Sequence, residues 1–143
     1  MKEPSDKRKR TLELQDRAIR FSVGVNAACP ETFTGLPSSV VWQQLVRAAD
    51  STSNNLCEAD DASSGADFLH KIKLALREAK ESRVCMAKLR LGALDGCGRT
   101  PALEREAGEL AAILATIALK VERRLEAKAS SRRRVETETK TKT

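Results

Sequence analysis

The side chains that could perform catalysis are few in this sequence. His70 is the single histidine, so a Ser-His-Asp or Cys-His arrangement would have only one candidate base. His70 lies between the apolar positions Phe68 and Ile72 without sharing their helical spacing, which favours an exposed surface residue. The sequence therefore predicts that the protein is not an enzyme.

Metal and cofactor sites have equally little support. The chain has four cysteines, Cys29, Cys57, Cys85 and Cys97. They include no Cys-x-x-Cys pair, the short spacing typical of zinc ligands, and fit small thiols in a reducing compartment. Glu58, Asp60 and Asp61 could hold a divalent ion, but acids near a helix end are more often solvated or bound to a basic neighbour. Gly96 and Gly98 lack the strand-to-helix context of a phosphate-binding loop, so we expect no metal and no cofactor.

Two basic clusters remain, one at each end of the chain. They are Lys7, Arg8, Lys9 and Arg10, and Arg132, Arg133 and Arg134. The formal net charge of +6 is distributed as +3 over residues 1–12, +5 over residues 120–143 and −2 over the rest. These clusters are candidate contacts for the phosphates of RNA or DNA, because they could release counterions on binding. They could equally be solvated ends that maintain solubility.

The composition favours an all-α protein. With 143 residues there is room for one domain, and aromatic residues make up only 3%, which argues against a sandwich or barrel of strands. The longest apolar stretch covers ten residues from Leu110 to Leu119, half of what a bilayer span needs, about 20. The basic N-terminus is followed by no apolar signal region, so we expect a cytoplasmic protein with no membrane contact.

Apolar residues recur at alternating steps of three and four in four segments, the spacing of one helix face. The four sets are Leu14, Ala18, Phe21, Val25 and Ala28; Trp42, Leu45, Ala49, Thr52, Leu56 and Ala59; Phe68, Ile72, Ala75, Ala79, Ser82, Met86, Leu89 and Ala93; and Leu103, Ala107, Leu110, Leu114, Ile117 and Val121. No single helix can bury such a face alone. The pattern predicts an antiparallel up-down four-helix bundle over residues 12–128.

Several local signals define the expected helix ends. Ser38 or Ser39 could cap the second helix, and Ser64 with Asp67 resembles a capping pair for the third. Pro101 suits the first turn of the fourth. Residues 1–11 and 129–143 show no apolar periodicity and are expected to be disordered basic extensions.

Polar positions inside the helices need partners. Asn55 on a packed helix should hydrogen-bond to another helix, or alternatively contact a ligand or nucleic acid. Glu78 and Glu81 are close on one helix and need a compensating cation, such as Lys73, Arg77 or Lys80 of this chain or of an adjacent one. Apolar residues outside the four sets should widen the core or, where exposed, form an oligomer interface. They are Ile19, Val46, Leu69, Leu76, Leu91, Ile113 and Leu119.

Residues 14 to 122 resemble a known bacterial family. The matching residues are Gln44, Arg47 to Ala49, Ser51, Asn55, Leu56 and Glu58, the run from Phe68 to Arg83 including Glu81, and Glu109, Leu110, Ile113, Leu114 and Ile117. This pattern is similar to the four-helix-bundle proteins first met as 23S rRNA intervening-sequence proteins. Ala59 stands where the family commonly has glycine, and Val84, Cys85 and Met86 replace its aromatic residues.

The resemblance implies a homopentamer of bundles with no catalytic activity. It also implies structural roles for Gln44, Arg47, Asn55, Glu58 and Glu81. A relative in this group is the accessory variability protein of diversity-generating retroelements, which acts with a reverse transcriptase and nucleic acid. We therefore expect a non-catalytic oligomer that binds RNA or DNA. The alternative is a scaffold that docks a protein partner such as a reverse transcriptase.

Overall fold

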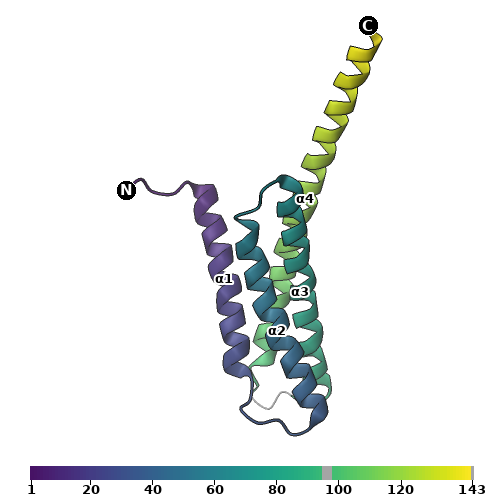
Figure 1. Ribbon diagram of the computed structural model, residues 1–143. Helices are drawn as coiled ribbons and strands as arrows, with labels where there is room; N and C mark the ends of the chain where they lie inside the picture. The colour runs from purple at the N-terminus through teal and green to yellow at the C-terminus, as the bar shows by residue number, and fades with distance from the viewer. Residues whose placement is uncertain (95–97, 143) are drawn as a thin grey trace.

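The computed structural model describes residues 1–94 and 98–142. It contains four helices: α1 (Asp6–Ala28), α2 (Leu36–Ala59), α3 (Gly65–Leu91) and α4 (Thr100–Thr141). Successive helices run in opposite directions, and α4 extends well beyond the other three (Figure 1). Among the described residues there is no strand, so the expected all-α, up-down four-helix bundle is confirmed.

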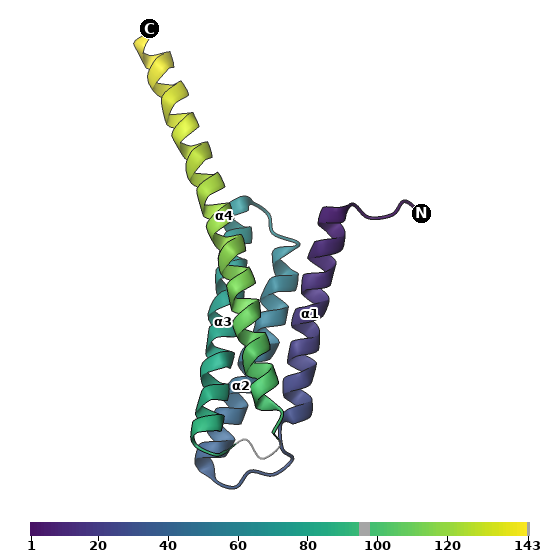
Figure 2. The same cartoon turned by 180° about the vertical axis from the view of Figure 1, so that it is seen from behind.

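Each helix packs against two neighbours. The most extensive pairings are α2 with α3 and α3 with α4, while α1 packs on α2 and more sparingly on α4. The view from behind shows α1 and α4 side by side and running in opposite directions (Figure 2). Helix α1 is therefore the least enclosed of the four.

The core consists almost entirely of the predicted apolar positions. One cluster, at the end of the bundle where α1 finishes, includes Phe21, Trp42, Met86 and Leu110. The other cluster includes Ala18, Ile72 and Leu114. Small residues such as Ala49, Ala79 and Ala107 are fully buried, which lets the helices approach closely. One predicted core position is wrong: Ala93 lies beyond the end of α3, is exposed, and has a φ of 54°.

Helix α2 begins earlier than the serines suggested. Its N-cap is Gly35, with Pro37 in the first turn, and no side chain caps it. Ser38 is buried inside the helix, and the hydroxyl of Ser39 accepts a hydrogen bond from the Gln43 side chain at 2.8 Å. Proline suits this first turn because its missing N–H needs no partner there. The expected cap at Ser38 or Ser39 is therefore corrected to Gly35.

The other expected boundaries agree with the structure. The hydroxyl of Ser64 accepts from the Asp67 backbone N–H at 3.1 Å and caps α3, and Pro101 lies in the first turn of α4. The polar stretch from Ser51 to Asn55 stays helical within α2. In that stretch Thr52, which is fully buried, satisfies its hydroxyl on the Ala48 carbonyl at 2.8 Å.

Both ends of the chain are more helical than the sequence predicted. Helix α1 already begins at Asp6, because the Ser5 hydroxyl accepts from the Arg8 backbone N–H at 3.2 Å and Asp6 favours the positive end of the helix dipole. Helix α4 continues to Thr141 instead of ending near residue 128. No glycine or proline follows Gly108 to stop it, and the hydroxyls of Thr137, Thr139 and Thr141 bond to carbonyls one turn earlier. The disorder expected over residues 1–11 and 129–143 is thus replaced by helix over most of both segments.

Candidate nucleic-acid interface

The two basic clusters lie at the same end of the bundle. Helix α1 starts at the end where α4 leaves the other helices, as both views show (Figures 1 and 2). The loop between α2 and α3 is at this end as well, because α2 runs toward it and α3 runs away from it. Cations that are more than 100 residues apart in the sequence therefore project from one end of the molecule.

Arg8 is already engaged within the protein. Its Nη1 lies 2.7 and 2.6 Å from the two carboxylate oxygens of Asp60, the residue that follows α2. The hydrogen bond from Arg8 holds the pKa of the Asp60 carboxyl below its usual value. Arg8 thus fastens the first turns of α1 to the end of α2, and it is less available to a phosphate than the sequence suggested.

The other predicted N-terminal cations are less engaged with carboxylates of the protein. Lys9 has a long contact of 3.8 Å with Glu3, and both side chains are well exposed. Within the part of the chain that the structure describes, Lys7 and Arg10 are exposed and form no ion pair. Lys7 and Arg10 are therefore the two residues of this cluster best placed to bind an external anion.

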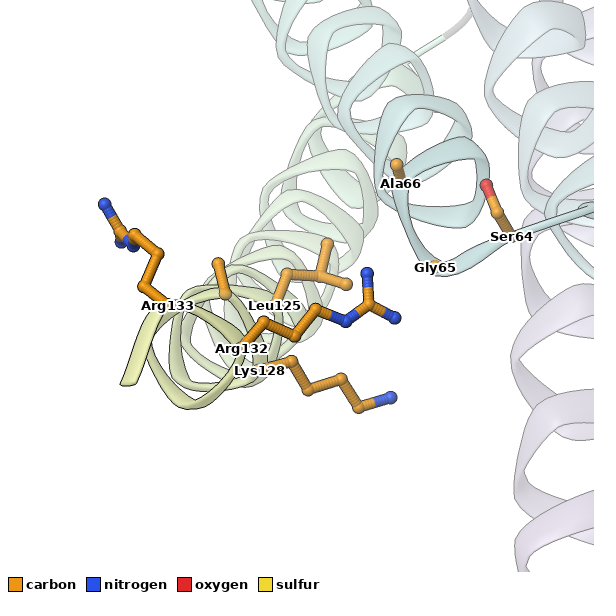
Figure 3. Close-up of a pocket in the computed structure, with 8 residues that line it drawn as sticks. Ser64, Gly65, Ala66, Leu125, Lys128, Arg132 and Arg133 are labelled. Carbon is orange, nitrogen blue, oxygen red and sulfur yellow. The ribbon is translucent and has the colours of Figure 1, made fainter. Parts of the chain in front are cut away.

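A shallow hollow lies where α4 leaves the bundle. It is lined by Ser64, Gly65 and Ala66 at the start of α3 and by Leu125, Lys128, Ala129, Arg132 and Arg133 of α4. Figure 3 shows the side chains of Lys128 and Arg132 extending to the side of α4 on which Ser64 and Gly65 lie, whereas Arg133 points away. The lack of a side chain at Gly65 permits the close approach of Leu125 of α4 to the start of α3, since a Cβ at Gly65 would lie 2.9 Å from Cδ2 of Leu125.

The three predicted C-terminal cations differ in how they are oriented relative to this hollow. Arg132 faces it together with Lys128, while Arg133 points elsewhere and Arg134 is exposed farther along the helix. Lys128 was missed by the sequence interpretation, although its spacing of four residues from both Arg124 and Arg132 places the three on one side of a helix. A second shallow hollow is lined by these three residues with Ala127 and Ser131. We call the group Lys7, Arg10, Arg124, Lys128 and Arg132 the basic end.

The residues of the family resemblance form contacts between α2 and α3. Arg47 of α2 bonds to Glu81 of α3 at 2.8 Å and lies 3.9 Å from Glu78. One carboxylate oxygen of Glu78 is buried and has no hydrogen-bond partner. Burial, followed by the negative charge of Glu81, raises the pKa of Glu78. Two cations compensate this charge: Arg47 on the neighbouring helix and, of the three that were expected, Arg77, since the charges of both lower the pKa of Glu78. Lys73 pairs with Glu122 of α4 instead.

The remaining motif residues have local roles. Lys71 pairs with Glu58 at 2.9 Å and links α3 to the last turn of α2. Asn55 is half-buried and donates to the Ser51 carbonyl at 2.8 Å within its own helix, so the expected bond between helices is absent at this residue. Gln44 is exposed on α2. These contacts give Arg47, Glu58 and Glu81 a part in holding α2 and α3 together.

The residues considered for catalysis or metal binding are dispersed. His70 is exposed, as expected. Asp60 and Glu58 are each taken by a basic neighbour, and no group of three potential metal ligands occurs in residues 1–94 and 98–142. Cys29, Cys57 and Cys85 are free thiols whose pKa values are raised by burial. Gly96 and Cys97 lie outside the described residues.

Hydropathy along the helices gives one further result. In the described part of the chain, none of the four helices combines the length and the apolar character that a bilayer crossing requires.

Comparison with known proteins supports the architecture. No protein-family profile matches the chain, and no curated protein sequence matches it. A crystal structure of a protein of unknown function from the S23 ribosomal protein family of Bacteroides thetaiotaomicron is similar to it, with a TM-score of 0.65. The two sequences are 22% identical, and the similarity covers 76% of this chain and 96% of the other. This likeness supports the fold and is only loosely in line with the resemblance to intervening-sequence proteins.

Proposed function

We propose that this protein is a non-catalytic, oligomeric helical bundle that binds RNA or DNA through its basic end. The observation that carries the proposal is the gathering of cations from both termini at one end of the bundle. A dense group of exposed cations attracts the phosphate backbone and releases its counterions. Such contacts carry little sequence information, so binding should depend weakly on base sequence.

The proposal of self-association rests on exposed apolar side chains. Leu12, Ile19 and Val23 are all exposed on α1, the helix that its neighbours enclose least. Their spacing of seven and four residues puts them on one face, which a second copy could cover. The homopentamer is the assembly that the family resemblance implies, and we retain it as the proposed state.

The alternative function is a scaffold for a protein partner such as a reverse transcriptase. A separate group of exposed apolar residues favours it: Leu36 and Val40 of α2, with Val84 and Leu91 of α3. Pull-down from a native extract would separate the two functions. A single protein recovered equally with and without nuclease treatment would favour the scaffold, and recovery that depends on nucleic acid would favour binding of RNA or DNA. The cytoplasmic location expected from the sequence stays a prediction.

Charge-neutral variants of the full chain test the proposed nucleic-acid binding. We would change Lys7, Lys128 and Arg132 to Gln and measure binding to RNA and DNA oligonucleotides by fluorescence anisotropy at low salt. The matched control changes three other exposed cations, Arg83, Arg99 and Arg105, to Gln and lowers the net charge equally. We expect the first variant to lose affinity at least tenfold, because each substitution removes on the order of one phosphate contact. The control should lose less than twofold. Equal losses, or no binding by the unmodified protein, would refute the proposal.

A further inference from the structure

Helix α3 carries more positive charge than the near-neutral body of the sequence suggests. Between Gly65 and Leu91 there are seven Lys or Arg residues and three Asp or Glu residues, a net charge of +4. Four of the exposed cations follow the outer side of the helix at steps of four, three and eight: Lys73, Arg77, Lys80 and Lys88. We call these four residues the α3 row. An α-helix places such positions within one half of its circumference, because 3.6 residues complete a turn.

The acidic residues of α3 make their hydrogen bonds and ion pairs outside this row. Asp67 accepts a hydrogen bond from the Ser63 backbone at 3.1 Å, in the turn before the helix. Glu78 and Glu81 lie toward α2, where Arg47 pairs with both. Glu78 and Glu81 therefore form their ion pairs with α2, although the charge of Arg77 also acts on Glu78.

Carboxylates of the neighbouring helices neutralise the α3 row only at its start. Lys73 pairs with Glu122 of α4. Glu104, another α4 carboxylate that faces α3, is bound by Arg90 at 3.0 and 3.1 Å. In residues 1–94 and 98–142, Arg77, Lys80 and Lys88 form no ion pair. These three side chains are therefore available to an external anion.

We propose that the α3 row is a second phosphate-binding surface and that its ligand is double-stranded nucleic acid. The inference rests on the proposed nucleic-acid binding and adds both a site and a class of ligand. The three unpaired cations of the row, from Arg77 to Lys88, extend over about 16 Å at 1.5 Å per residue. A duplex rises about 3.4 Å per base pair, so these cations span roughly five base pairs of backbone.

The location of the aromatic side chains distinguishes a duplex from a single strand. Proteins that hold single strands stack the bases on exposed aromatic rings. Here Phe21 and Trp42 are buried in the core, Phe33 and Phe68 are half-buried, and the sequence has no tyrosine. Unpaired bases would find no fully exposed ring, whereas a duplex keeps its bases stacked on one another and presents its phosphate backbone to the protein.

The test uses a double variant of the full chain, Arg77→Gln with Lys80→Gln. Its matched control is Arg99→Gln with Arg105→Gln, which lowers the net charge equally at the start of α4. Binding to 20-base-pair DNA and RNA duplexes, and to the corresponding single strands, is measured by anisotropy from 50 to 300 mM salt. Circular dichroism confirms that each variant folds.

We expect the unmodified protein to bind duplexes more tightly than single strands. The Arg77 and Lys80 variant should bind duplexes about tenfold more weakly, with the slope of log affinity against log salt reduced by about two, and the control should change less than twofold. If this variant keeps its duplex affinity while the basic-end variant loses binding, the α3 row is not a binding surface. The proposed function would then still stand. Equal or tighter binding of single strands would overturn the duplex assignment. If polyglutamate competes as strongly as a duplex does, the duplex assignment is wrong and an acidic protein is the partner. If the unmodified protein binds no nucleic acid at all, both proposals are wrong.

Discussion

Arg17 of α1 joins two carboxylates of α4: its Nε lies 2.6 Å from an oxygen of Glu106, and its Nη2 pairs with Glu109. The three side chains are partly exposed and lie between the two helices with the sparsest packing. This charged contact therefore supplements a thin apolar interface and helps to hold α1 in the bundle.

Replacing Arg17 should lower the stability of the folded state slightly, by an amount that depends on the salt concentration. We expect Arg17→Met to lower the free energy of unfolding by about 1 kcal/mol or less, because partly exposed ion pairs contribute little. The loss should shrink in 1 M salt, which screens exposed charges. Urea unfolding of both proteins at low and high salt measures it. A loss that is independent of salt would mean that Arg17 acts through its packing instead.

The Arg8–Asp60 pair predicts a pH dependence. The pKa of Asp60 is held below its ordinary value of 3.8 by Arg8, so this group stabilises the folded state above that value and loses its contribution as the pH falls through the folded pKa. We expect Asp60→Asn to lower the melting temperature at pH 7, and the difference from the unmodified protein to shrink as the pH falls below 3.8. Calorimetry across this range tests it. A constant difference would show that ionisation is not the cause.

The carboxyl of Glu78 should change the stability of the folded state with pH in the opposite direction. Its pKa is raised above 4.5 by burial and by Glu81, so the folded state loses stability as the pH rises from 4.5 through the folded pKa. Glu78→Gln should therefore melt at a higher temperature than the unmodified protein at pH 7 and at the same temperature near pH 4. The control is Glu104→Gln, which removes a carboxyl whose pKa is lowered by Arg90 and should melt lower at pH 7. Two shifts of the same sign at pH 7 would contradict this explanation.

The extension of α4 should be dispensable for the fold. All residues from 127 to 142 are exposed, so ending the chain at Glu126 should change the free energy of unfolding by about 0.5 kcal/mol or less. The far-ultraviolet circular dichroism per molecule should still fall, because a helical segment is lost. A large drop in stability would show that the extension packs against another copy of the chain.

The exposed face of α1 predicts the effect of charge on assembly. Light scattering of the unmodified protein should give a multiple of the 15.7 kDa chain mass, about 78 kDa for five copies. Ile19→Lys with Val23→Lys should shift the mass toward the monomer, because two buried charges oppose the contact. The control Val135→Lys changes an exposed residue of the α4 extension and should leave the mass unchanged. A monomeric unmodified protein would contradict self-association.

The fold was predictable because one repeated spacing determines it. The core positions from Trp42 to Ala59 and from Ile72 to Leu89 are buried as the three- and four-residue steps indicated. The ends were less predictable, since helix over residues 129–141 has no apolar face to reveal it and depends on continuity with a stable helix. The Gly35 cap of α2 was hidden by two serines of higher capping preference.

The candidate site was predictable only in part. Two basic clusters were evident in the sequence, but their location at one end follows from the number and direction of the helices. The ion pair of Arg8 with Asp60 and that of Arg47 with Glu81 have no local sequence signal, because each joins residues far apart in the sequence. The net charge of −2 over the central residues also concealed the cations of α3, because acidic residues elsewhere in that stretch offset them.

Because α4 continues without interruption from the core to Thr141, its exposed part can act as a lever arm. From Leu125 to Thr141 the arm measures about 24 Å, so a tilt of roughly 10° at its base displaces the tip by about 4 Å. The fulcrum is the close approach of Leu125 to Gly65. A force applied to the arginines on the arm would therefore act on the first turn of α3 through Leu125.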